Sequence, residues 1–106
     1  MQRLNVTGLP DVPSAAAALF YSEWLGQAQA ILAKGDALAL IFPPAGHEHT
    51  GWRLSAVQTL ARESAPLRVN GVASDDPKAI AEALAYLAGA DGVTGQYFPL
   101  DSVGAV

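Results

Sequence analysis

The residue types best suited to chemistry stand together in one short segment, His47-Glu48-His49. Two imidazoles and a carboxylate are ligands that zinc and related transition metals accept. A metal site needs three or four converging ligands, and the sequence contains no other histidine and no cysteine. We therefore interpret the segment as a solvated loop and predict no metal. The alternative is a metal-binding protein that uses His47 and His49, and a thermal shift with divalent metal that His47→Ala abolishes would reveal it.

A second acidic pair, Asp75-Asp76, stands directly before Pro77. Proline at the first position of a helix loses no hydrogen bond, and an aspartate before it can accept from free backbone N–H groups. Asp75 adds negative charge at the positive end of the helix dipole. We predict that Asp76 caps a helix and that the pair is not a catalytic acid and base.

The composition excludes several classes of function. The 106 residues carry a formal charge of −4 and include no cysteine, which removes thiol nucleophiles, thiolate metal sites and disulfides. Lysine and arginine form no cluster, which argues against nucleic acid or an anionic membrane because phosphate binding needs concentrated positive charge. Neither a signal-peptide core nor an apolar run of the ~20 residues that span a bilayer is found. We expect a cytoplasmic protein.

The spacing of apolar and turn residues predicts alternating strands and helices. The run from 37 to 42 is continuously apolar, which is typical of a strand buried on both faces. In chain order we expect a strand at 2–7, a helix at 14–34 capped by Ser14 and ended by Gly35, a strand at 37–42, a loop at 45–50, a helix at 54–64, a strand at 67–72, a helix from Pro77 that breaks at 89–92, and a strand at 93–100.

This β-α-β-α-β-α-β order predicts an α/β protein with a Rossmann-like, three-layer fold: a small, mostly parallel sheet of about four strands joined by right-handed crossovers. The length suits one compact core, so we expect a single domain over residues 1–106. Open α/β sheets bind ligands beyond the carboxyl ends of their strands. A small-molecule pocket, its ligand unknown, is therefore expected among residues 43–49, 74–76 and Thr7-Gly8.

Residues 54–101 resemble the second half of the short-chain dehydrogenase/reductase family. That family has a helix running into ALARELAP, a strand IRVNAVAPG, a helix ending in FLAS and a last strand TGQxLxVDGG. The counterparts here are LARESAP at 60–66, RVNGVA at 68–73, YLA at 86–88 and TGQ at 94–96. The residues that carry the family pattern are Arg68, Val69, Asn70, Thr94, Gly95, Gln96 and Asp101.

The residues on which catalysis depends in the resembled family have no counterparts here. Aligned through residues 56–57, the family's Tyr-x-x-x-Lys pair falls on Thr50 and Leu54. In the family the Tyr transfers a proton, while the Lys lowers the Tyr pKa and holds the ribose. The family's catalytic Ser, expected after the strand at 37–42, falls on Pro43-Pro44, which has no hydroxyl. We therefore assign no catalytic residue.

The resemblance also implies a Gly-rich cofactor loop, Thr-Gly-x-x-x-Gly-x-Gly, whose glycines let a pyrophosphate approach the backbone. Thr7-Gly8 begins this pattern, but Val12 and Ser14 stand where glycines belong. The Pro-Gly that follows the Arg-Val-Asn strand in the family is replaced by Ser74-Asp75. The family domain reaches about 200–250 residues, so we expect about half of the fold to be absent. We predict no NAD(P) cofactor.

Three large aromatic residues, Tyr21, Trp24 and Trp52, stand in or beside the helices that form a four-helix bundle across the main dimer interface of the resembled family. Aromatic residues are enriched at interfaces, and they also fill monomer cores. Missing strands and helices would leave apolar faces uncovered, and a symmetric dimer would bury them. We predict a homodimer that associates through its helices, with these aromatics as possible interface residues.

The predicted function is that of a short-chain-dehydrogenase-like protein without the catalytic Ser, Tyr and Lys, acting as a homo-oligomeric binding or regulatory module and not catalytic alone. The alternative is a subunit of an NAD(P)-dependent oxidoreductase whose partner chain supplies the Gly-rich half and the catalytic Tyr and Lys. Residues 68–70 and 94–96 would then serve as scaffold. Dehydrogenase activity that appears only with the partner would identify this second case.

Overall fold

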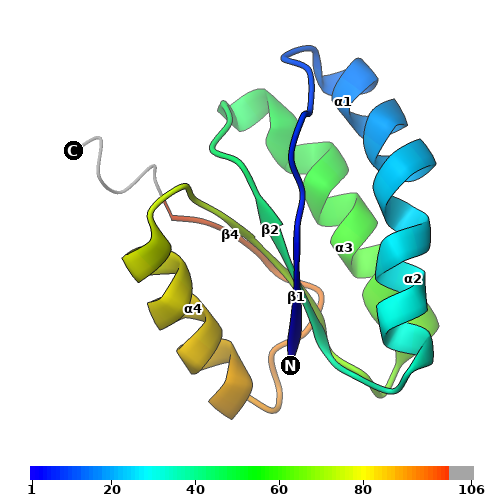
Figure 1. The fold of residues 1–106 in the computed structure, drawn as a ribbon, viewed down its shortest axis with the longest axis vertical. Coiled ribbons are helices and arrows are strands. Elements are labelled where there is room, and N and C mark those ends of the chain that lie inside the picture. The colour runs from blue at the N-terminus through cyan, green and yellow to red at the C-terminus, as the bar shows by residue number, and fades with distance from the viewer. Residues whose placement is uncertain (101–106) are drawn as a thin grey trace.

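The computed structural model describes residues 1–100, which form one sheet of parallel strands with helices on both faces (Figure 1). The strands are β1 (Gln2–Asn5), β2 (Leu38–Phe42), β3 (Val69–Ala73) and β4 (Tyr97–Pro99), and they lie side by side in chain order. Every neighbouring pair is parallel. The α/β, Rossmann-like, three-layer fold with four strands that the sequence predicts is confirmed.

The helices are α1 (Pro13–Leu19), which continues through the π-helical segment Phe20–Trp24 into α2 (Leu25–Ala33), then α3 (Thr50–Ser64), which follows the 3₁₀ turn His47–His49, and α4 (Pro77–Gly89). The π-helical segment begins at Phe20, whose ring is fully buried and lies against the rings of Phe42 and Trp52. This aromatic cluster fastens the first helical layer to the end of β2.

Helix boundaries differ from the expected ones in two places. Ser14 does not cap α1, because Val12 takes the N-cap position without a side-chain hydrogen bond and Pro13 follows it. Proline suits this start, since its φ is already helical and it has no N–H to satisfy. The helix expected from 54 begins at Thr50, because the 3₁₀ turn leads directly into it and occupies half of the expected loop. Gly35 ends α2 as expected, with φ +89°.

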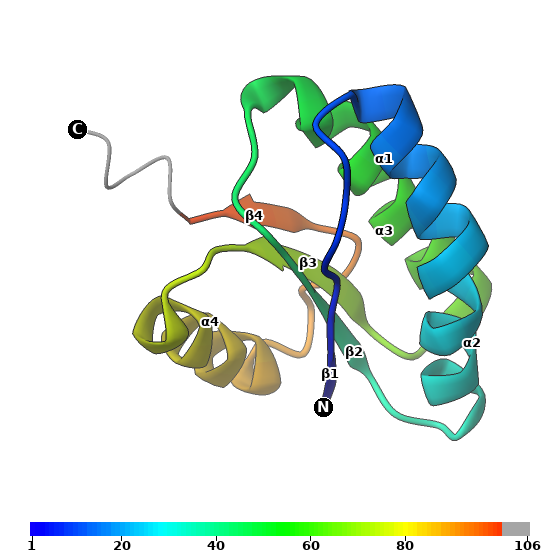
Figure 2. The ribbon, with the colours of Figure 1, turned by 45° about the horizontal axis from the view of Figure 1, so that its top comes forward.

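The strand β2 lies at the centre of the molecule and faces two cores. Its residues Leu38, Leu40 and Phe42 pack against α1 to α3, whereas Ala39 and Ile41 pack against α4. Successive side chains of a strand point to opposite faces, so a strand covered on both sides is apolar throughout. Figure 2 shows the two layers, with α1, α2 and α3 on one side of the sheet and α4 on the other.

The connection from β3 through α4 to β4 has an unusual hand. Helices on one face of the sheet connect β1 to β2 and β2 to β3, but α4 packs on the opposite face while β4 continues in the same direction across the sheet (Figure 1). A change of face without a change of direction reverses the hand. The first two crossovers are right-handed and the third is left-handed, so the expectation of right-handed crossovers is wrong for the last. The third layer exists because of this reversal.

Candidate functional site

The carboxyl ends of β1, β2 and β3 lead into the loops 6–12, 43–46 and 74–76 at one end of the sheet (Figure 1). Two pockets open at this end. One of about 320 Å³ lies over β1 and β2, between Arg3, Thr7 and Ser74. The other, of about 250 Å³, is lined by the loops 9–11 and 43–46 together with Glu48, His49 and Arg53, and we call it the Arg53 pocket. Both occupy the end at which open parallel sheets bind ligands.

Arg53 is the most unusual residue of this region, because its charged side chain is only 1% exposed. Its Nη1 donates to the carbonyl oxygen of Pro43 over 2.8 Å and to the hydroxyl oxygen of Tyr97 over 3.1 Å. Its guanidinium carbon lies 4.8 Å from the ring centre of Phe42 and 5.6 Å from the ring of Trp52, within the range of cation–π attraction. The buried Nε has no hydrogen-bond partner among residues 1–100. Arg53 therefore connects α3 to the end of β2, and its Nε–H remains without an acceptor among these residues.

Arg53 was not predicted as a site residue from the sequence, although the helical spacing around it indicates a buried position. Arg53 precedes the buried residues Ala56, Val57 and Leu60 of α3 by three, four and seven positions. This spacing places all four residues on one face of a helix. Because the helix was expected to begin at 54, the arginine fell outside it by one residue. An earlier start would have predicted a charged side chain pointing into the core.

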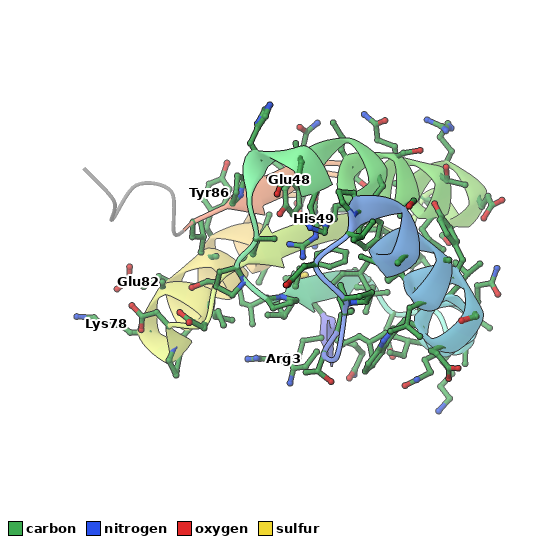
Figure 3. All side chains as sticks on the ribbon, turned by 90° about the horizontal axis from the view of Figure 1, so that it is seen from above. Arg3, Glu48, His49, Lys78, Glu82 and Tyr86 are labelled. Carbon is green, nitrogen blue, oxygen red and sulfur yellow. The ribbon has the colours of Figure 1, made fainter. Side chains whose placement is uncertain are left out.

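His49 lines the same pocket, and the fold uses both nitrogens of its ring. Its Nδ1 accepts a hydrogen bond from Trp52 Nε1 over 3.0 Å, so the ring proton is on Nε2, which lies 2.8 Å from the carbonyl oxygen of Asp11. The ring thus joins the loop before α1 to the first turn of α3. Figure 3 shows Glu48 and His49 together at this end of α3. Ring nitrogens held in this way cannot also bind a metal, and within residues 1–100 no three metal-ligating side chains gather.

The positions matched to the family's catalytic residues carry no proton-transferring side chain. Thr50 opens α3, Leu54 follows one turn later, and both are half-buried. Pro43 offers its carbonyl oxygen to Arg53. The one tyrosine that contacts the buried cation, Tyr97, comes from β4 and lines neither of the two pockets described above. No tyrosine among residues 1–100 stands beside a basic side chain at either pocket.

The family-pattern residues of β3 and the segment before β4 form a hydrogen-bonded lock. The fully buried Asn70 donates from Nδ2 to the carbonyl oxygen of Val93 over 2.9 Å and accepts at Oδ1 from the N–H of Gln96 over 3.1 Å. Thr94 Oγ1 accepts from the N–H of Val69 over 3.0 Å. Gly95, at φ +73°, donates its N–H to the carbonyl oxygen of Val69 over 2.7 Å. The lock explains why the strand expected at 93–100 is confined to 97–99.

Arg68 extends this lock to the end of α4. Its Nη1 donates to the carbonyl oxygens of Leu87 and Ala90, over 2.6 and 2.9 Å. These carbonyls lie in the last turn of α4 and just beyond it, where helix carbonyls lack partners within the helix. The Arg-Val-Asn and Thr-Gly-Gln motifs thus have a structural role. The remaining family-pattern residue, Asp101, lies outside the described residues.

The loop after β3 confirms the expected helix cap. Asp76 takes the N-cap position of α4, and its Oδ1 accepts from the N–H of Lys78 over 3.0 Å, with Pro77 between them. Ser74 Oγ in turn accepts from the N–H of Asp76. In the loop after β1, Gly8 has φ +74°, a conformation that glycine adopts without strain. Thr7, from the loop after β1, and Ser74, from the loop after β3, both line the pocket of about 320 Å³.

The three aromatics expected at an oligomer interface lie in different surroundings. Tyr21 is 44% exposed on the first helical layer. Trp24 is partly buried against the larger core. Trp52 packs between Phe20 and Phe42 and donates to His49, so it belongs to the core of one chain. Of these three aromatics only Tyr21 is exposed, and the interface itself stays a prediction.

No helix in the described part of the chain has the length and apolarity needed to cross a membrane. Comparison with protein-family models matched residues 4–100 to a family described as short chain dehydrogenase-like protein. Neither the search of curated proteins nor that of solved structures gave a match. The family match spans β1 to β4, and it therefore includes both the lock and the Arg53 pocket.

Proposed function

We propose that this chain, which belongs to the short chain dehydrogenase-like protein family, performs no redox chemistry alone and acts as a homo-oligomeric binding or regulatory module. The observation that carries the proposal is the buried contact between Arg53 and the carbonyl oxygen of Pro43. It occupies the end of β2, where the resemblance places the family's catalytic Ser. A proline carbonyl held by an arginine can neither orient a substrate carbonyl nor transfer a proton.

The oligomeric part of the proposal is supported by the outer surface of the first helical layer. Tyr21 is exposed there, and so are Ala15, Ala18 and Gly26. Small side chains on the exposed side of a helix let a second helix approach closely, and an exposed aromatic ring on the same helix can serve as an anchor. A symmetric pairing of this surface across a twofold axis would bury Tyr21 on both copies.

Light scattering of the purified chain at several concentrations tests this oligomer. We expect a dimer for the natural sequence and a shift to monomer for Tyr21→Ser, since the substitution removes the anchor. Tyr86→Ser is the matched control, because Tyr86 is also an exposed tyrosine, at 62%, but lies on α4 on the other face of the sheet (Figure 3). A monomer at all concentrations, or a dimer that Tyr21→Ser leaves intact, would remove the helix-mediated dimer.

A second candidate function, a subunit completed by a partner chain, is favoured by the strand order. In a doubly wound sheet the ligand crevice lies where the strand order reverses, as in 3-2-1-4-5-6. The described strands run β1-β2-β3-β4 without reversal. A crevice would form if a further strand joined the open side of β1. Gln2 and Val6 direct their N–H groups to β2, so the alternate residues Arg3 and Asn5 direct theirs to that open side.

Isolation of the tagged chain from its natural cells distinguishes the two candidates. The isolated material and the chain produced alone are assayed side by side for oxidation of NADH and NADPH with a panel of ketones and aldehydes. Activity confined to the natural material, together with slowed hydrogen exchange at the Arg3 and Asn5 amides, would favour the completed subunit. Inactivity of both, with unchanged exchange, agrees with the module.

A further inference from the structure

We infer that the Arg53 pocket binds a small carboxylate, with preference for one that carries an ammonium group at its other end, as a small amino acid does. This inference rests on the proposed binding role and names the ligand class for it. It uses none of the family-pattern residues.

The charge of Arg53 has no acidic hydrogen-bond partner among residues 1–100. An arginine remains protonated in a protein, and a buried charge is stabilised by a partner of opposite sign or by full hydrogen bonding. Arg53 is 99% buried, and among residues 1–100 its hydrogen-bond acceptors are one carbonyl and one hydroxyl oxygen, both neutral and both on Nη1. Nε has no acceptor at all. The guanidinium fork is thus short of the carboxylate that matches its geometry.

The position and size of the Arg53 pocket also favour a small ligand. Arg53 forms part of the wall of a hollow of about 250 Å³ at the carboxyl ends of the strands. Ligand pockets for drug-sized molecules run from about 300 to 1,000 Å³. A hollow just below that range suits a molecule of a few heavy atoms and is too small for a dinucleotide. The hydrogen bonds of His49 to the carbonyl oxygen of Asp11 and of Trp52 to His49 hold the loop 9–11 beside the first turn of α3.

The charge at the mouth of the pocket favours a ligand with an ammonium group. Asp11 and Glu48 line it and are exposed, so negative charge stands at the rim while the buried arginine stands inside. In Figure 3, Glu48 lies at the solvent-facing end of α3 beside His49. A plain anion gains from Arg53 and is repelled by the rim. A molecule that places its carboxylate beside Arg53 and its ammonium group beside Asp11 and Glu48 is attracted at both ends. This attraction gives the preference for an amino acid.

The test uses the whole chain, titrated with glycine and with acetate and followed by two-dimensional NMR, including the side-chain Nε–H signal of Arg53. We expect glycine to bind more tightly than acetate and to move the Arg53 Nε–H signal and the amides of residues 45–49. Arg53→Met should weaken glycine binding about tenfold or more, since charge-assisted hydrogen bonds are lost. Arg62→Met, an exposed arginine on the same helix, is the matched control and should change nothing.

Glu48→Gln keeps the test decisive should Arg53→Met not fold. Removing this rim charge should strengthen acetate binding by about two- to threefold and weaken glycine binding, so the ratio of the two affinities falls. Absence of saturable binding of both probes, or binding that moves neither Arg53 Nε–H nor residues 45–49, overturns the inference. Neither result bears on redox activity or on NAD(P) binding, so failure here is distinguishable from failure of the proposed function.

Discussion

Two regions of the sheet differ in how far they keep the residues of the family. The amino ends of β3 and β4 keep the family-pattern residues, whereas the positions matched to the family's catalytic residues do not. Before β4, the pattern residues Arg68, Asn70 and Thr94 bind backbone groups of three different segments and hold β3, α4 and β4 together. The positions that the resemblance matches to the family's catalytic residues carry Pro43, just after β2, and Thr50 and Leu54, in α3. The residues that match the family are those that hold the fold. A family resemblance carried by such residues is evidence for the architecture and not by itself for activity.

The largest effect that would sharpen this contrast is expected at the lock. Asn70→Ala should lower the free energy of unfolding by about 3 kcal/mol, because it leaves the carbonyl of Val93 and the N–H of Gln96 without their partner. Urea denaturation measures the change, and Gln29→Ala, at an exposed helix position, should be close to neutral. A loss well under 1 kcal/mol for Asn70→Ala would mean that the lock does not hold the fold.

A smaller effect is expected at the cap of α4. Asp76→Ala should cost about 1 kcal/mol of stability, because the N–H of Lys78 loses its acceptor. Asp75→Ala at the adjacent exposed position should cost a few tenths at most, through the helix dipole alone. Thermal unfolding of the two variants compares them directly. Equal losses would show that charge near the helix end matters and that the cap geometry does not.

Effects of similar or smaller size, and of opposite sign, are expected at two glycines. Gly95→Ala should destabilise by about 1 kcal/mol, because φ +73° strains a residue with a Cβ even though the space around it is open enough. Gly26→Ala, in α2 with nothing within 4 Å of the added Cβ, should stabilise by about 0.5–1 kcal/mol through helix propensity. Chemical denaturation of both measures the signs. A neutral Gly95→Ala would show that the turn before β4 tolerates other conformations.

Local patterns predicted much of this fold. The apolar run of β2, the Asp76-Pro77 start of α4 and the Gly35 end of α2 each depend on a few neighbouring residues, so the sequence identifies them. The hand of the last crossover does not follow from local spacing, since α4 has an apolar stripe that fits either face of the sheet. The early start of α3 was missed because the 3₁₀ turn at 47–49 has no strong local signal.

The sequence predicted where the pockets lie but not which residues form the contacts in them. Parallel topology puts pockets at the carboxyl ends of the strands, and both pockets lie there. Outside α3, the partners of Arg53 are Phe42 at the end of β2, Pro43 just after it and Tyr97 in β4, and Tyr97 stands 44 positions away along the chain. Such long-range contacts depend on the packed structure. The same holds for His49, whose ring reaches Asp11 across 38 positions and is thereby removed from the metal chemistry that its neighbour His47 suggested.

We propose that the scaffold of the family persists here without its redox chemistry. Titration of NAD⁺, NADH, NADP⁺ and NADPH into the purified chain, followed by calorimetry, tests this most directly. We predict no saturable heat for any of the four, since Val12 and Ser14 stand where the cofactor loop needs glycines. Micromolar binding of any of them would contradict the claim and would point to a dinucleotide site near Thr7-Gly8.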